Sequence, residues 1–139
     1  MVELFNIPKF IRKKEILDFV KFAMKEIKLQ KGNLNIVFLP NLKSLNRKFF
    51  GKNSDTNVIA FPWNERNVLD ADIFLGEIYI GVRQLRKEKK RSLKERALYL
   101  ILHGLLHIKG YGDKTEEENL KMFKIQERIF KKWKERRRV

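Results

Sequence analysis

Residues 92–113 read SLKERALYLILHGLLHIKGYGD, and this stretch decides both the fold and the candidate site. Its middle part, residues 93–106, is apolar on nearly every side, which predicts a helix buried in the core. Ser92 and Glu95 have the spacing of a capping box and mark the start of this helix. The only two histidines of the chain, His103 and His107, are four residues apart, so they project from one helix face.

The turn after the helix completes a candidate metal site. Gly110 is expected to end the helix and to reverse the chain. The reversal would bring Asp113 back to the two imidazoles, which gives the pattern H-x3-H-x5-D. A lone histidine in an apolar helix is usually a hydrogen-bonded core residue, but a pair at this spacing, followed by a turn and an acid, favours a metal. Three protein ligands are typical of a catalytic zinc site. We predict that His103, His107 and Asp113 bind one divalent metal ion, with zinc as the expected metal.

The composition restricts the class of protein. The chain has 139 residues and no cysteine, so we expect one domain without disulfides or thiolate metal ligands. The first residues lack the continuous apolar core of a signal peptide, and no apolar run approaches the ~18 residues of a membrane span. We therefore expect a cytoplasmic protein that does not contact a membrane. The oligomeric state is left open.

The charge of the chain points to a polyanionic partner. The net charge is +15, from 32 Lys and Arg against 17 Asp and Glu. Neutralising phosphates releases condensed counterions, so such an excess favours nucleic acid. A lysine-rich surface typical of heat adaptation is the competing explanation, but such surfaces usually carry matching glutamates. An anionic membrane surface is a third and weaker alternative.

Hydrophobic spacing and turn residues predict the remaining elements. Strands are expected at 1–7, 34–39, 56–63 and 72–81, and helices at 13–28, 42–50 and from a second capping box at 115–118 onward. Residues 51–55, 64–70 and 82–92 are expected to connect them, and Gly76 to form a bulge or close approach. Five apolar residues of the last helix are expected in the core: Met122, Phe123, Ile129, Phe130 and Trp133.

These elements give an α+β fold, because strands come early and long helices come late. We expect a single domain over residues 1–139, with a small mixed sheet of about four strands packed with helices. The central buried helix carries the histidine pair. A basic C-terminal tail is expected from about residue 131.

Three segments resemble motifs of one protein family. Residues 103–113 are similar to H-G-x-L-H-L-x-G-Y-D-H. Residues 45–62, LNRKFFGKNSDTNVIAFP, are similar to L-N-x-x-Y-R-G-K-D-x-P-T-D-V-L-S-F-P, and residues 75–78, LGEI, to L-G-D-I. The chain thus resembles the YbeY family of bacterial rRNA maturation factors, which are endoribonucleases specific for single strands. Order and spacing also agree, so the resemblance covers most of the chain.

Four of the chain's departures from these motifs bear on the expected site. Asp113 replaces the family's third histidine; a carboxylate is an acceptable zinc ligand, and it could shift the preference toward harder ions such as manganese. Phe50 replaces an arginine that could contact phosphate. The acids of T-D-V and G-D-I become Asn57 and Glu77. The chain is therefore identified as a divergent member.

The resemblance implies a hydrolase, a metal-dependent endoribonuclease acting in rRNA maturation and ribosome assembly. The metal held by the two histidines and Asp113 would lower the pKa of bound water toward ~7, from 15.7 in bulk. Glu77 is a candidate general base for this metal-bound water. A non-catalytic RNA- or ribosome-binding assembly factor with a structural metal is the alternative. A zinc protease is less favoured, because the general-base glutamate of H-E-x-x-H enzymes is Gly104 here.

Basic residues on two segments are candidate RNA contacts. Arg47 and Lys48 could replace the missing family arginine. A basic cluster precedes the histidine helix and comprises Arg83, Arg86, Lys87, Lys89, Lys90 and Arg91. A second cluster, at the C-terminus, is equally well explained as a solvated tail: Lys131, Lys132, Lys134, Arg136, Arg137 and Arg138. Phe49, Phe50 and Trp63 could stack on unpaired bases, although at least two of them are expected in the core.

Overall fold

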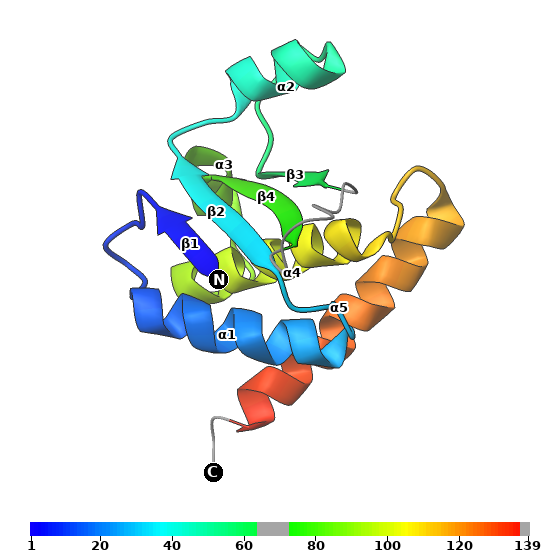
Figure 1. Ribbon diagram of the computed structural model, residues 1–139. Helices are drawn as coiled ribbons and strands as arrows, with labels where there is room; N and C mark the ends of the chain where they lie inside the picture. Colours follow the sequence, from blue (N-terminus) through cyan, green and yellow to red (C-terminus); the bar gives the residue numbers. More distant parts are fainter. Residues whose placement is uncertain (64–72, 137–139) are drawn as a thin grey trace.

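A computed structural model describes residues 1–63 and 73–136. It contains four strands and five helices in this part of the chain (Figure 1). The strands are β1 (Val2–Phe5), β2 (Asn33–Leu39), β3 (Val58–Pro62) and β4 (Phe74–Gly81). The helices are α1 (Lys13–Glu26), α2 (Lys43–Phe50), α3 (Val82–Lys87), α4 (Leu93–Lys109) and α5 (Glu116–Arg136). The predicted connection 64–70, the first residue of the predicted strand 72–81, and Arg137 and Arg138 lie outside the described residues.

The four strands form one mixed sheet in the order β1-β2-β4-β3. β1, β2 and β4 are parallel, and β3 pairs antiparallel with β4. Side chains of β2 alternate between buried and half-buried, and its buried side holds Leu34, Ile36 and Phe38. This period of two means that helices cover one face of the sheet. The predicted α+β fold with a mixed four-stranded sheet is confirmed.

Helix α4 lies against the buried face of the sheet, flanked by α1 and α5 (Figure 1). It approaches β4 closely at Gly104, where an added Cβ would lie 2.7 Å from the Cγ2 atom of Ile78. α5 is held against α1 by aromatic contacts, and the ring centroids of Phe19 and Trp133 are 5.2 Å apart. No helix among the described residues is long and apolar enough to cross a membrane.

Glycine and capping residues behave as their sequence patterns predict. Gly76 has φ +146°, and the β2–β4 register shifts beside it, so a bulge is present. The backbone N–H of Glu95 donates to the Ser92 hydroxyl at 3.2 Å. Thr115 and Glu118 form a reciprocal capping box, with distances of 3.2 and 3.1 Å.

The structure corrects three expectations about the helices. Residues 82–92 are not only a connection, because α3 forms there and buries Leu85 completely. Residues 131–136 are not a tail but the last turns of α5, where Trp133 is 7% exposed. Phe123 is 54% exposed rather than in the core. The inward position on that stripe is taken by Gln126, four residues after Met122 and therefore on the same helix face.

Candidate metal centre

The last turns of α4 place the two histidines side by side. The Nε2 atoms of His103 and His107 are 3.0 Å apart. Gly110, with φ +120°, ends the helix, and its N–H donates to the carbonyl of Leu106 at 3.1 Å. The chain then turns back, so that an Asp113 carboxylate oxygen lies 3.2 Å from His107 Nε2. One ligand atom from each of these three residues lies within 4.8 Å of the other two.

Hydrogen bonds at the far side of each ring fix how the histidines face each other. His103 Nδ1 lies 3.1 Å from the side-chain oxygen of Gln126, and His107 Nδ1 lies 3.0 Å from the Tyr111 carbonyl. Carbonyl oxygens can only accept, so both Nδ1 atoms donate and both Nε2 atoms carry lone pairs. Two such lone pairs at 3.0 Å repel each other and favour a cation between them.

The donor set fits a divalent metal. Metal–nitrogen bonds of about 2.0–2.1 Å in a tetrahedral site give neighbouring ligands about 3.3 Å apart, close to the observed 3.0 and 3.2 Å. Burial lowers the pKa of His103 below its ordinary 6.5; Gln126 and Asp113 act in the opposite direction, and His107 adds to the lowering. The neutral imidazole that results is the form that binds metal. His103, His107 and Asp113 could therefore hold a metal ion.

A cavity of about 720 Å³ opens in front of these residues. Its walls come from β3, from the end of α2 and from the turn between α4 and α5. Lys52 and Lys114 contribute positive charge to the lining, and Phe50 contributes a ring that stacks on Phe61 at 6.1 Å. Among the described strands β3 pairs only with β4, so its other edge offers backbone groups to this cavity.

Comparison with known proteins decides the family. A sequence model of the family described as "Endoribonuclease YbeY" matches residues 3–134. The chain belongs to the YbeY family.

Relatives and a solved structure agree with this assignment. The chain is 31% identical to the Endoribonuclease YbeY of Sulfurihydrogenibium sp. over 130 residues, covering 89% of this chain and 85% of the relative. It is 35% identical to the Endoribonuclease YbeY of Oceanobacillus iheyensis, covering 82% and 80%. The solution structure of TM1509 from Thermotoga maritima has the same fold, with a TM-score of 0.60 and 24% identity over 98% of this chain and 93% of that one.

Glu77 does not join the metal residues in this YbeY family member. Ile78 packs against Gly104 of α4, so the neighbouring Glu77 points to the opposite face of the sheet. There it accepts a hydrogen bond from the Tyr79 hydroxyl at 3.0 Å. Burial and this carboxylate raise the pKa of Tyr79. Strand alternation directs Glu77 away from the histidines, and this position does not support the prediction that it is the general base.

Most of the predicted basic cluster lies near the start of α4, whereas the histidines lie near its end. Ten residues separate Leu93 from His103, which is about 15 Å along the helix. Its exposed members on α3 and the following loop therefore lie away from the metal residues: Arg83, Arg86, Lys87, Lys89 and Lys90. Arg47 and Lys48 are also exposed, on α2, whose end borders the cavity.

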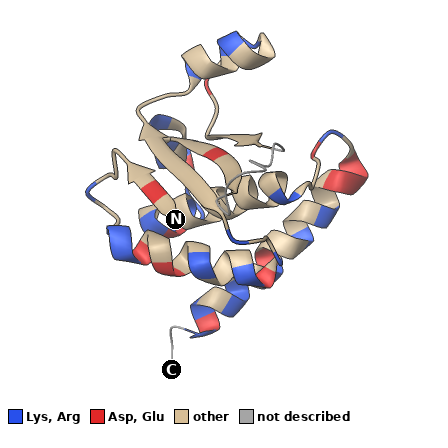
Figure 2. Cartoon of the chain, in the orientation of Figure 1, with Lys and Arg blue, Asp and Glu red and all other residues tan. Residues whose placement is uncertain are grey.

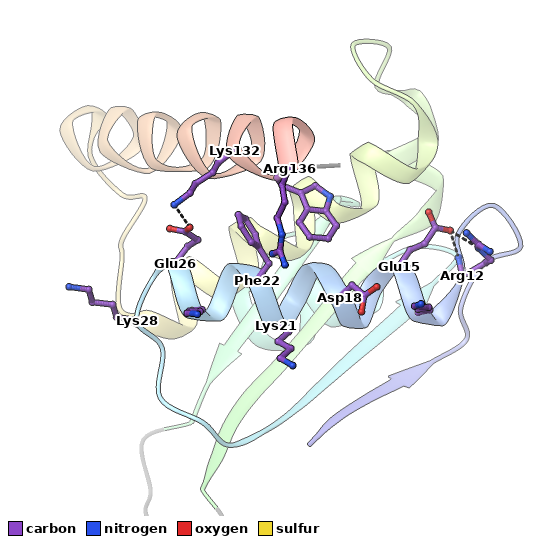
Figure 3. Close-up of a pocket in the computed structure, with 12 residues that line it drawn as sticks. Arg12, Glu15, Asp18, Lys21, Phe22, Glu26, Lys28, Lys132 and Arg136 are labelled. Carbon is purple, nitrogen blue, oxygen red and sulfur yellow. Dashed lines mark hydrogen bonds and ion pairs between the residues drawn. The ribbon is translucent and has the colours of Figure 1, made fainter. Parts of the chain in front are cut away.

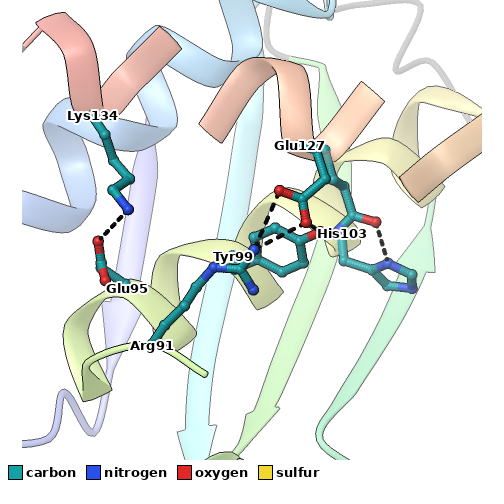
Figure 4. Close-up of polar contacts among 7 residues, drawn as sticks. Arg91, Glu95, Tyr99, His103, Glu127 and Lys134 are labelled. Carbon is teal, nitrogen blue, oxygen red and sulfur yellow. Dashed lines mark hydrogen bonds and ion pairs between the residues drawn. The ribbon is translucent and has the colours of Figure 1, made fainter. Parts of the chain in front are cut away.

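Arg91 is paired within the protein and has a structural role. Its guanidinium lies 3.0 Å from a Glu127 carboxylate oxygen and 4.0 Å from the centroid of the Tyr99 ring (Figure 4). The Tyr99 hydroxyl donates to the same carboxylate at 3.2 Å. Burial, followed by Glu127, raises the pKa of Tyr99 to about 12. Arg91 joins α5 to α4 and is already neutralised, so the prediction that it contacts RNA is not supported.

Three predicted stacking residues are on the surface. Phe49 is 52% exposed, and Phe50 and Trp63 are each 51% exposed, so the expectation that at least two lie in the core is wrong. They pack on the rings of Phe61 and Phe74 and leave their other sides open. Of the three rings only that of Phe50 lines the cavity, and base stacking stays a prediction.

Sequence reasoning missed the residue that orients His103. Gln126 is 5% exposed and lies within the apolar stripe of α5. A polar residue on such a stripe must find a buried partner, and that was the available signal. Lys52, Lys114 and Glu118, which line the cavity, have no comparable signal in the sequence.

Proposed function

We propose that the protein is a metal-dependent endoribonuclease, a hydrolase that cleaves single-stranded RNA during rRNA maturation and ribosome assembly. One observation carries the proposal. The lone pairs of His103 and His107 and the carboxylate of Asp113 converge beside an open cavity, in a member of the endoribonuclease YbeY family. The partners would be rRNA precursors and the ribosome, and their location would place the protein in the cytoplasm.

The proposed mechanism assigns a role to each residue. His103, His107 and Asp113 would hold one divalent ion, with zinc proposed. When bound, such an ion acidifies water and polarises a phosphate oxygen. Gln126 and the Tyr111 carbonyl keep the Nδ1 protons in place, so both Nε2 atoms stay available.

The cavity would bind and orient the RNA. Lys52 and Lys114 would attract the phosphates on either side of the cleaved bond, since both side chains line the cavity. Phe50, held flat against Phe61, would offer its exposed face to a base. An unpaired base is needed for such stacking, which supports a single-stranded substrate. Protease chemistry has no support here, because Gly104 packs against Ile78 where a protease has its glutamate.

Metal content and RNA cleavage test the proposal together. We would compare the wild type with His107→Ala and Asp113→Asn, using a single-stranded RNA and its duplex. The expected result is about one equivalent of divalent metal in the wild type, with metal and single-strand cleavage lost in both variants. Glu77→Gln is the matched control and should keep both properties, because its side chain faces the other side of the sheet.

Two outcomes would overturn the proposal. Equal cleavage by wild type and His107→Ala would identify a contaminating nuclease. A wild type that holds metal and binds RNA without cutting it, and whose His107→Ala variant melts at a lower temperature, would identify an assembly factor with a structural metal.

A further inference from the structure

A second and larger cavity, of about 1120 Å³, lies between α1 and α5 (Figure 3). We refer to it as the α1–α5 groove. Phe22 and Trp133 border it, only 9% and 7% exposed, with ring centroids 5.2 Å apart. Seven cationic side chains and three carboxylates complete the lining. The groove is therefore strongly basic, and its two aromatic rings are largely buried.

The cations are arranged in a line. Lys14, Lys21 and Lys25 follow one another at seven and four residues on α1, so they share one face of the helix. Lys14 and Lys25 are about 16 Å apart along the axis. Lys28 continues the line past the helix end, and Arg136 reaches from α5 toward α1 beside Phe22, 5.3 Å from its ring centroid (Figure 3). Figure 2 shows basic residues recurring along α1 and the last turns of α5.

The carboxylates of the groove do not neutralise this line. Glu26 is paired with Lys132. Glu15 is 3.2 Å from both Arg12 and Lys94, so its charge is also taken up. Among the described residues, no carboxylate lies within ion-pair distance of the four lysines of the line. Asp18, the third carboxylate, lies between Lys14 and Lys21 on α1 without an ion pair to either, so the groove keeps an excess of cations. Such an excess attracts a chain of phosphates and releases condensed counterions.

One end of the groove lies at the helix of the metal centre. The ammonium group of Lys109, the last residue of α4, donates to the backbone carbonyl of Lys28 at 2.9 Å. Lys109 follows His107 by two residues, so the line of cations arrives at the turn of α4 that carries this histidine. A chain that leaves the metal centre around the end of α4 would meet Lys109 and Lys28 first.

We propose that the α1–α5 groove binds the phosphate backbone of RNA, without regard to sequence, as a second contact for the RNA that is cut at the metal centre. That the RNA is also the substrate rests on the proposed function. Phe22 and Trp133 are too buried to stack on bases, so the contacts are with phosphates. An acidic protein fits less well, because protein interfaces rely on central aromatic anchors, and the two aromatic rings of this lining are only 9% and 7% exposed.

Salt-dependent binding tests the proposal. The groove variant is Lys14→Gln/Lys21→Gln/Lys25→Gln. The control variant is Lys124→Gln/Arg128→Gln/Lys131→Gln, which removes the same charge from an exposed face of α5 that lines no described cavity. Fluorescence anisotropy would follow a labelled single-stranded RNA that is long enough to reach both sites. A chelator would prevent cleavage during the measurement.

Three lost phosphate contacts should lower the slope of log K against log salt by about 2. If the electrostatic contribution vanishes near 1 M salt, that slope corresponds to roughly 50-fold weaker binding at about 0.15 M. The control variant should stay within about threefold of the wild type. Equal losses in the two variants would mean that net charge alone is responsible, and would overturn the proposal.

Two further readouts separate the alternatives. If polyglutamate binds the wild type and loses affinity in the groove variant while RNA binding is unchanged, the groove is a protein-docking surface and the proposal is wrong. With metal present, the groove variant should show a raised KM on long RNA and an unchanged kcat on a fragment that fills only the metal cavity. A wild type that binds RNA through the groove but never cuts it would refute the nuclease function alone.

Discussion

Replacing Gln126 by leucine tests how the metal centre is held. Gln126 lies on α5, is 5% exposed, and accepts the Nδ1 proton of His103 at 3.1 Å. Leucine has a similar volume but no acceptor, so the Nδ1 proton would be buried without a partner. A buried unsatisfied donor costs about 1–3 kcal/mol.

The same loss should appear in metal affinity. Removing a hydrogen-bond partner behind a metal-ligating histidine typically weakens binding about 10- to 100-fold, which is about 1.4–2.7 kcal/mol. The two estimates are similar in size but measure different things: the first is the cost of the unpaired Nδ1 proton, and the second is the effect of a poorly oriented His103 ring on metal binding. We therefore expect Gln126→Leu to bind zinc about 10- to 100-fold more weakly than the wild type.

Competition with a chromophoric chelator would measure the affinity, and denaturant unfolding of the metal-free proteins would measure stability. Gln126→Glu is the matched control, because its carboxylate still accepts from Nδ1 and should retain the affinity of the wild type. A folded Gln126→Leu protein with the affinity of the wild type would refute the reasoning. So would a glutamate variant that loses as much affinity as the leucine variant.

Three other predictions concern pH and packing. Burial lowers the pKa of His103, so the folded protein takes up a proton at His103 less readily than the unfolded chain. The unfolding free energy of the metal-free protein should therefore fall as the pH drops below about 6.5 and stay level above it. Thermal melts at graded pH would show this dependence, and it should be weaker in His103→Gln. Gly104→Ala would push a Cβ to 2.7 Å from Ile78, so it should destabilise the fold by about 1–3 kcal/mol in denaturant unfolding, with partial rescue by Ile78→Val. Tyr99, whose pKa is raised to about 12, should appear as a late step in an absorbance titration and vanish in Tyr99→Phe. Because the unfolded chain releases this proton near pH 10, stability should fall more steeply between pH 10 and 12 in the wild type than in Tyr99→Phe. Level stability over that range would contradict the assignment.

What the sequence predicted well is local. The helix of His103 and His107, its end at Gly110 and the return of Asp113 depend on residues close together in the chain. Helical period and turn chemistry are sufficient to bring such residues together. The bulge at Gly76 is of the same kind, since a glycine inside a strand already marks close backbone approach.

What the sequence could not predict depends on contacts between distant elements. Glu77 faces away from the histidines because α4 packs on the other face of β4, and the sequence does not say which face a helix will cover. Arg91 is neutralised by Glu127, a contact that spans 36 residues. Gln126 meets His103 across 23 residues. Each outcome is set by how α4 and α5 pack, which no spacing within a single segment determines.

Helix α5 fixes the distance between the metal centre and the α1–α5 groove. Gln126 stands behind the metal centre and Arg136 stands in the α1–α5 groove, ten residues or about 15 Å along one rigid rod. If both sites bind RNA as proposed, an RNA shorter than this span would reach only one of them, whereas a longer one would be held at both and gain the added avidity of two linked contacts. Each cut would then turn a two-point ligand into one-point fragments. Dissociation rates measured on RNAs of graded length should therefore step up below a threshold length, so that the protein keeps its precursors and lets its products go.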